Sequence, residues 1–191
     1  MKTQEDTVKG RFDWIERMGV HEAYHQNPIN RWIHWICIPL ELWSIIKFLS
    51  LIRFADYNLA LLVVLVVSLI YILVDLVAGM AMTFFLFIML TSAVYINMGA
   101  LWKEILFSVL VFVASFLFQT KIGHGIFEKG VDDTTRNIDE FKKNKDPIPM
   151  ILIFYYHFLQ ILFSFGYRTD LFTQMKNYRN LEMEKNRPTI S

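Results

Sequence analysis

Histidine is the residue type in this sequence best suited to chemistry, because all five copies lie in or beside apolar segments. Imidazole is a common ligand for iron and zinc, and three or four histidines in a chain with one cysteine suit a transition-metal site with open coordination positions. The spacing of His21 and His25 places both on one face of a helix. The pattern predicts a metal site, with bis-histidine haem ligation and hydrogen-bonded packing histidines as the alternatives. The five residues are His21, His25, His34, His124 and His157.

The segments that must position these histidines read as membrane spans. Residues 57–102 carry one charged side chain, Asp75. As a single helix this stretch would be about 69 Å long, over twice the roughly 30 Å hydrocarbon core of a bilayer, so two spans share it. A tight connection is expected near Gly79. The predicted apolar segments are Trp32–Phe54, Asn58–Ala78, Ala81–Met98, Ile105–Thr120 and Met150–Tyr167.

The predicted fold class is all-α, a polytopic membrane helical bundle of four to five apolar helices. The apolar runs lack the alternation of apolar and polar residues that the strands of a membrane barrel would show. We expect one integral membrane domain over residues 1–191. Its parts are a polar N-terminal segment with the first histidine motif (1–31), four spans (32–122), a polar loop (123–148), a fifth apolar segment (149–167) and a solvated tail (168–191).

The composition excludes several classes of protein. The chain is 54% hydrophobic and 19% charged, with a mean hydropathy of +0.36, which does not fit a soluble enzyme or a disordered chain. A net charge of +1 gives no basic surface for phosphates, so no nucleic-acid partner is expected. The single cysteine, Cys37, cannot form an intrachain disulfide. Residues 1–30 hold no apolar secretory leader, so insertion would rely on the spans themselves.

The distribution of Lys and Arg predicts the orientation in the membrane. Five lie in the N-terminal segment and six in the loop after the fourth span, against three on the opposite side, which places the N-terminus in the cytoplasm. Four crossings return the chain to its starting side, so His25, His34 and His124 can meet at the cytoplasmic face. His157 lies about 12 Å along a helix from Pro149 and reaches the group only if its segment tilts or re-enters. A complete fifth crossing would put the basic tail on the far side, so the last segment is re-entrant or buried in protein unless the charge rule is weak here.

Several other polar or small residues have two interpretations each. Asp75 is favoured as an interhelical hydrogen-bond partner over a proton-path residue. Gly123 and Gly125 either let the backbone approach the site closely or end a helix. Glu128 either accepts the ring N–H of a ligating histidine or is a solvated loop charge. Glu41 either supports a histidine of the first span or makes an interhelical polar contact.

Two motifs resemble those of a known family. Residues 24–39, YHQNPINRWIHWICIP, are similar to the HxNPxNxxIHxxxxP signature of a family of small multi-span membrane proteins. Residues 119–128, QTKIGHGIFE, resemble its second signature. The order of the motifs, the three apolar segments between them and the closing residues 165–168 agree along nearly the whole chain. The sequence thus resembles the family of the fungal 2-hydroxy-palmitic acid dioxygenase, an endoplasmic-reticulum enzyme of fatty-acid α-oxidation.

The resemblance implies an Fe(II) site and the residues that build it. Its catalytic metal ligands would be His25, His34 and His124, with His157 preferred to His21 as a fourth ligand. Asn30 would orient the first motif. Di-iron membrane hydroxylases and desaturases share this habitat, but they typically use eight or more histidines, and five are too few.

The implied activity is a membrane dioxygenase reaction on 2-hydroxy long-chain fatty acids. Such an acid can chelate Fe(II) through its carboxylate and hydroxyl and leave a position for O2, so no organic cofactor is needed. Oxidative cleavage would give a fatty acid one carbon shorter. Arg31 and Lys121 could pair with the substrate carboxylate, although topology anchoring explains them as well. Acids from sphingoid-base breakdown are one source of substrate, and the membrane would be the endoplasmic reticulum, or the inner membrane in a bacterium.

Two alternatives from other classes stay open at this point. One is a non-enzymatic membrane protein that binds lipid or serves as a scaffold, with its histidines as interhelical hydrogen bonds. The other is a bis-histidine haem protein. The sequence assigns no oligomeric state.

Overall fold

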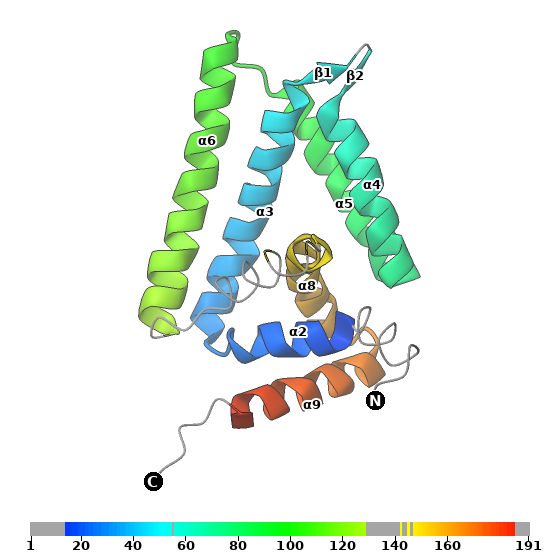
Figure 1. Cartoon of the computed structure of the whole chain (residues 1–191). Coiled ribbons are helices and arrows are strands. Elements are labelled where there is room, and N and C mark those ends of the chain that lie inside the picture. The colour runs from blue at the N-terminus through cyan, green and yellow to red at the C-terminus, as the bar shows by residue number, and fades with distance from the viewer. Residues whose placement is uncertain (1–13, 55, 129–141, 143–144, 146, 186–191) are drawn as a thin grey trace.

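The computed structural model describes residues 14–54, 56–128, 142, 145 and 147–185. The regular secondary structure of the described chain is helical apart from one pair of two-residue antiparallel strands, so the predicted all-α class is confirmed (Figure 1). The helices are α2 (Trp14–Ala23), α3 (Pro28–Ser50), α4 (Leu59–Val74), α5 (Leu76–Tyr95), α6 (Leu101–Leu117), the π-helix η1 (Phe118–Phe127), α8 (Ile148–Ser164) and α9 (Thr169–Lys185), and the strands are β1 (Arg53–Phe54) and β2 (Tyr57–Asn58).

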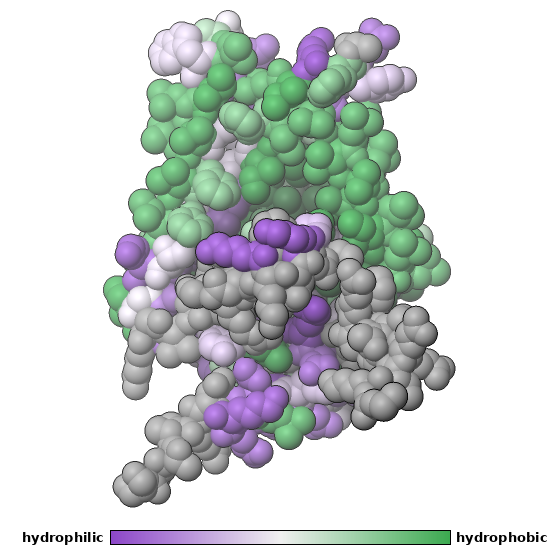
Figure 2. Space-filling model, viewed as in Figure 1, coloured by the Kyte–Doolittle hydropathy of each residue, from purple (hydrophilic) through white to green (hydrophobic). Residues whose placement is uncertain are grey.

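Three helices in the described chain are long and apolar enough to cross a membrane. They are α3, α5 and the continuous helix Leu101–Phe127, which joins α6 to η1. Two shorter apolar helices, Leu59–Val74 and Met150–Ser164, bring the number of apolar helices into the predicted range of four to five. Figure 2 shows an apolar surface over α3 to α6, with hydrophilic residues gathered beyond its two ends. This pattern is that of a polytopic membrane protein.

The first apolar helix begins at Pro28, four residues before the predicted Trp32. Asn27 is its N-cap, and the side-chain Oδ1 accepts a hydrogen bond of 2.8 Å from the N–H of Ile29. Proline at the first helical position lacks the N–H that would otherwise be unpaired there. The Asn-Pro pair therefore starts α3 and places His34 two turns inside it.

The connection between α4 and α5 lies at Asp75, whereas the sequence placed it near Gly79. The Asp75 carboxylate caps α5 by accepting a 3.0 Å hydrogen bond from the N–H of Ala78. Tyr167, in the turn between α8 and α9, donates a 2.6 Å hydrogen bond to the same carboxylate, so Asp75 joins separate segments of the chain, as the favoured interpretation expected. Gly79 instead permits close packing, because a Cβ there would collide with the backbone of Tyr71 on α4. A capping residue, rather than a glycine, ends the preceding helix.

Helices α2 and α9 lie across one end of the bundle and contact each other (Figure 1). Met18 of α2 and Met175 of α9 are buried between them, and a Cβ on Gly19 would lie 2.6 Å from the Cβ of Tyr178. The segment predicted as a solvated tail thus forms a helix over Thr169–Lys185 that packs on α2, while most of its side chains are exposed. Leu171, Phe172, Met175 and Tyr178 form an apolar stripe of α9 that packs against the core, although the helix is polar on average.

The last apolar helix, α8, packs among α2, α3, α4 and α5. Tyr155 and Leu159 are fully buried, and the ring of Tyr155 stacks on Tyr71 with centroids 4.8 Å apart. The Tyr71 hydroxyl donates a 2.8 Å hydrogen bond to the carbonyl of Ile151. With 17 residues, α8 is about 26 Å long, shorter than the bilayer core. Burial of this helix within the protein brings its polar residues to the interior.

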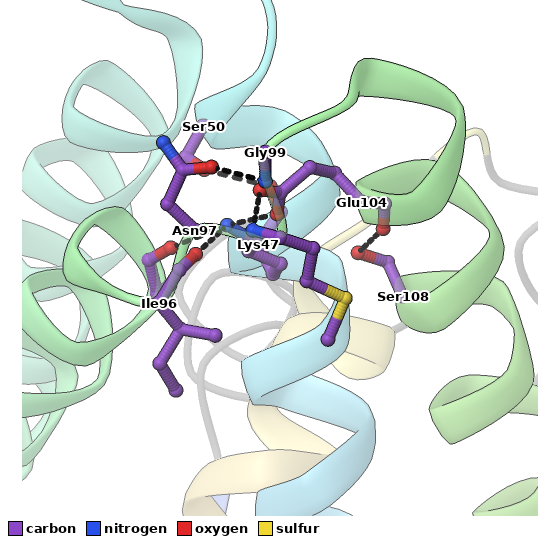
Figure 3. Close-up of polar contacts among 9 residues, drawn as sticks. Lys47, Ser50, Ile96, Asn97, Gly99, Glu104 and Ser108 are labelled. Carbon is purple, nitrogen blue, oxygen red and sulfur yellow. Dashed lines mark hydrogen bonds and ion pairs between the residues drawn. The ribbon is translucent and has the colours of Figure 1, made fainter.

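A buried ion pair fixes the end of the bundle opposite α2 and α9. Lys47 of α3 pairs with Glu104 of α6 at 2.6 Å, and its ammonium donates hydrogen bonds of 2.9 and 2.5 Å to the carbonyls of Ala93 and Ile96 (Figure 3). Glu104 also accepts a 2.6 Å hydrogen bond from the N–H of Met98. Lys47, one of the three basic residues assigned to that side of the membrane, is therefore a buried interhelical residue. The pair ties α3, the end of α5 and the start of α6 together.

Candidate metal centre

Five histidines from separate parts of the chain meet around one small cavity. Nε2 of His34 lies 3.1 Å from Nε2 of His124, and Nε2 of His21 lies 3.4 Å from Nε2 of His157. The His25 ring is central, with its centroid 4.1 to 5.5 Å from those of the other four. All five line a cavity of about 60 Å³ and are buried. The fold thus brings together the three histidines that topology predicted, and it adds both candidates for a fourth ligand.

Backbone carbonyls fix the orientation of three of the rings. Nδ1 of His25, His34 and His157 lies 2.8 to 2.9 Å from the carbonyl four residues earlier in the chain. A carbonyl only accepts hydrogen bonds, so Nδ1 carries the hydrogen in each ring and Nε2 carries the lone pair. Metal-binding histidines are typically held in this way by a partner on the second ring nitrogen. Nε2 of His34 contacts Nε2 of His124 and Nε2 of His157 contacts Nε2 of His21, so all three lone pairs face other imidazoles of the cluster or, at His25, the cavity.

Within the cluster, His25 has a buried ring nitrogen without a hydrogen-bond partner. Its side chain is 1% exposed, and its Nε2 has no hydrogen-bond partner in the described chain. Burial, together with the imidazoles of His21, His34 and His157, holds the pKa of His25 well below its usual range, so the ring is neutral. An unpartnered buried lone pair costs free energy unless something binds it. A metal ion would satisfy it.

The donor set fits a transition-metal ion. Two triplets, one of His21, His25 and His157 and one of His25, His34 and His124, have potential ligand atoms within 4.8 Å of one another. Two nitrogens about 2.1 Å from a shared ion at octahedral or tetrahedral angles are about 3.0 to 3.4 Å apart. The Nε2 separations of 3.1 and 3.4 Å fall within this range, which is also that of a hydrogen bond between two imidazoles. Neutral imidazole is a ligand that suits iron, zinc and copper.

A small hydrogen-bonded junction joins the two sequence motifs. Glu128, at the end of η1, accepts hydrogen bonds of 2.7 Å from the N–H of Asn27 and 3.3 Å from Nδ2 of Asn30. Asn30 is fully buried, and its carbonyl accepts from Nδ1 of His34. Arg31 donates a 2.9 Å hydrogen bond from Nε to the carbonyl of His25. Glu128 therefore contacts the support of His34 rather than a ligand ring, and the Nε of Arg31 is used to hold the backbone of His25.

The helix that carries His124 is a π-helix, a rare form that often occurs at functional sites. The wider turn is visible where the N–H of Glu128 bonds the carbonyl of Gly123, five residues earlier. Gly123 packs directly on the Asn30 side chain, where a Cβ would come closer than 3.0 Å to Oδ1. At Gly125 a Cβ would meet only the carbonyl of Thr120, at 3.5 Å. Of the two glycines, Gly123 is the one that lets η1 approach α3.

Further polar residues surround the cluster. Gln160 hydrogen-bonds Glu22 and accepts a 3.0 Å bond from Nε1 of Trp35, and burial raises the pKa of the Glu22 carboxyl. Glu41 accepts a 2.6 Å hydrogen bond from Nε2 of Gln119, so it supports no histidine directly. Sequence reasoning gave no role to Gln119, which lines the histidine cavity and whose Oε1 is buried without a partner in the described chain. Its place in the second motif was the available signal. Lys121 is exposed.

The fold and the cluster define an all-α protein with apolar helices able to span a membrane and a buried group of five histidines at one end of the bundle. The chain belongs to the family described as 2-hydroxy-palmitic acid dioxygenase Mpo1-like, whose model matches residues 13–137. A relative in Saccharomyces cerevisiae, named 2-hydroxy-palmitic acid dioxygenase MPO1, is 24% identical over 183 residues, which cover 93% of this chain and 98% of the relative. No solved structure gives a significant match to the chain.

Proposed function

We propose that this protein is an Fe(II)-dependent membrane dioxygenase that converts 2-hydroxy long-chain fatty acids to fatty acids one carbon shorter. Family membership and the name of the yeast relative support the substrate class and the reaction. The observation that carries the proposal is the convergence of histidine Nε2 atoms on one buried cavity, three of them with Nδ1 held by a carbonyl. This arrangement suits a metal with open coordination positions.

His25, His34 and His124 would hold the ion, with His157 as the fourth ligand and His21 beside it. When bound, ferrous iron supplies a redox centre at which a 2-hydroxy carboxylate and dioxygen can react together. In the balanced reaction, one 2-hydroxy acid and one O2 give the shorter fatty acid, carbon dioxide and water. C1 leaves as carbon dioxide, C2 becomes the new carboxyl carbon, and the electrons lost by these two carbons reduce the O2 completely.

The residues of the chain contribute orientation and a dry environment. The carbonyls behind His25, His34 and His157 keep each Nε2 directed into the cavity, and burial keeps His25 neutral and able to donate its lone pair. The helices shield the cluster from bulk water, which strengthens the electrostatic interactions within it. The unpartnered Oε1 of Gln119 is available to accept a hydrogen bond from the substrate hydroxyl.

The location of the cluster suits an amphiphilic substrate. It lies at the end of the bundle beside α2 and α9, where the polar surface begins (Figures 1 and 2). We place this end at the cytoplasmic face of the endoplasmic-reticulum membrane, with the N-terminus in the cytoplasm, on the count of Lys and Arg. A fatty acid could then present its head group to the histidines while its tail stays in an apolar environment. Sphingoid-base breakdown would be one source of such acids.

A haem protein is less compatible with the same residues. The histidine cavity of about 60 Å³ is far below the roughly 300 Å³ at the lower limit of ordinary small-molecule sites, so it does not accommodate a porphyrin. A lipid-binding or scaffold protein would leave the lone pair of His25 unsatisfied. These two readings also differ from the proposal in what purified protein contains: a Soret absorption band for haem, and no stoichiometric metal for a scaffold.

The test is oxygen consumption by protein purified anaerobically with Fe(II), using 2-hydroxypalmitate as the substrate. We expect turnover to require Fe(II) and to give the acid one carbon shorter, measured by mass spectrometry. His34→Ala and His124→Ala should lose both the iron and the turnover. Ile126→Ala, a change on the exposed face of η1, is the matched control and should retain both. Turnover that survives both histidine substitutions would refute the proposal.

A further inference from the structure

A second, apolar cavity lies next to the histidine cavity. It has a volume of about 130 Å³, and its walls come from α3, α5 and α8. Apart from His157 and the indole of Trp35, its lining side chains are hydrocarbon or thioether, including Leu42, Met82 and Phe158. An apolar cavity of about this size stays dry and binds a hydrocarbon of roughly six carbon atoms. We refer to it as the apolar chamber.

The apolar chamber adjoins the histidine cavity. Ile38 and His157 line both cavities, so the two spaces share a wall formed by these side chains. His34, Ile38 and Leu42 are spaced by four residues on α3 and therefore follow one face of the helix. Leu42 lies about 12 Å beyond His34 along the helix axis. The chamber thus extends from the level of the histidines toward the apolar middle of the bundle.

We propose that the apolar chamber binds the part of the substrate hydrocarbon chain that directly follows the hydroxyl-bearing carbon. The inference rests on the proposed function, because it needs an amphiphile with its head group at the histidines. The occupant must be apolar and must begin at the metal site, and the alkyl chain of a 2-hydroxy acid has both properties. The rest of a palmitic chain exceeds the chamber and lies outside it. The protein therefore selects for the presence of a chain and depends little on its full length.

The affinity of 2-hydroxy acids of increasing chain length measures this selection. Each methylene that enters the chamber should tighten binding about fourfold, and the gain should end after roughly six carbons, when the chamber is full. Partition into detergent would increase smoothly with chain length and would show no such limit. The dependence of affinity on length therefore separates a bounded chamber from general solubility in the membrane.

The location of the bound chain can be measured without catalysis, from the fluorescence of Trp35 on the chamber wall. The probe is a 2-hydroxy fatty acid carrying bromine atoms close to the head group, which quench a neighbouring indole. The chain has five tryptophans, so the contribution of Trp35 is taken as the difference between wild type and Trp35→Phe. We expect quenching of Trp35 by this probe, and much less by an acid brominated at the end of its tail. Equal quenching by both probes, or none, would overturn the proposal.

A pair of substitutions on α3 tests the same point by filling space. Leu42→Phe adds volume inside the chamber, whereas Leu40→Phe makes the same change on a side chain that is 44% exposed on the outside of the helix. Leu42→Phe should weaken binding of 2-hydroxypalmitate at least tenfold and leave 2-hydroxybutyrate unaffected. Leu40→Phe should change neither. Equal behaviour of the two variants, with intact thermal unfolding, would refute the chamber.

These outcomes separate the chamber from the proposed function. Quenching of Trp35 in protein that takes up no Fe(II) and shows no turnover when Fe(II) is supplied would retain the chamber as a lipid site and reject the dioxygenase. Iron-dependent turnover without quenching of Trp35, and without an effect of Leu42→Phe, would retain the dioxygenase and reject the chamber.

Discussion

Replacement of Gly123 by alanine tests how closely the two motif-bearing helices must approach. The added Cβ would come closer than 3.0 Å to Oδ1 of the buried Asn30 and would lie 3.5 Å from Cε1 of His34. Asn30 cannot move freely, because its Nδ2 donates to Glu128 and its carbonyl holds Nδ1 of His34. The methyl group must therefore displace η1 from α3, and with it the Nε2 atoms of His34 and His124, now 3.1 Å apart.

The free-energy cost of Gly123→Ala follows from the closeness of this packing. One extra methyl in a well-packed interior costs about 1 to 3 kcal/mol. If the strain falls on the metal-bound state, affinity for the ion drops between about fivefold and 150-fold. The assay is equilibrium competition with a chromophoric chelator for Fe(II) under anaerobic conditions, with Co(II) as a redox-stable substitute. Thermal unfolding of the metal-free protein reports how much of the strain destabilises the fold instead.

Gly125→Ala is the matched control, because the same methyl group two residues later meets only the carbonyl of Thr120, at an ordinary contact distance. Alanine also has the better helix propensity, so this variant should bind the ion normally and be equally or slightly more stable. Equal metal affinity and equal stability for the two variants would refute the reasoning. The role of Gly123 would then not depend on the space beside Asn30.

Three further perturbations address the bundle itself. Lys47→Met leaves the buried carboxylate of Glu104 unpaired and should cost about 3 to 5 kcal/mol in unfolding experiments, whereas the double variant with Glu104→Leu should recover most of this loss. Tyr167→Phe removes the donor to Asp75 and should cost about 1 to 3 kcal/mol, seen as a lower midpoint of thermal unfolding with an unchanged metal content. Met175→Ala opens a cavity between α2 and α9 and should lower the free energy of unfolding by about 2 to 5 kcal/mol. That variant should make α9 a preferred site of limited proteolysis, and an unchanged cleavage pattern would contradict the packing described here.

The features that sequence predicted are those set by strong local patterns. Long apolar runs predicted the all-α class. The return of the chain to its starting side predicted that His25, His34 and His124 meet, and they do. The connection at Asp75 was missed because an aspartate within an apolar run reads as a buried charge, although it is also a preferred N-cap. The stripe of α9 was missed because its mean hydropathy is low while its apolar residues recur at helical spacing.

The remaining features depend on tertiary contacts that sequence spacing does not encode. The π-helical turn of η1 has no local signature, yet it helps set where His124 lies relative to α3. The contact of Gln119 with Glu41 joins residues 78 positions apart. His157 reaches the cluster because α8 packs inside the bundle. The count of Lys and Arg favoured a re-entrant or buried segment but did not indicate where it packs. The sequence could therefore identify the candidate ligands but not their supporting contacts.

His25 limits how many ions the cluster can hold. The two triplets of histidines overlap at this one residue. Its Nδ1 is bonded to the carbonyl of His21, so only Nε2 is free, and one lone pair serves one ion. Two ions could not both use His25 as a ligand, and the Nε2 atoms of His34 and His124 are close enough to share a single ion. We therefore expect one metal ion per chain, and elemental analysis of the purified protein would contradict this if it found two.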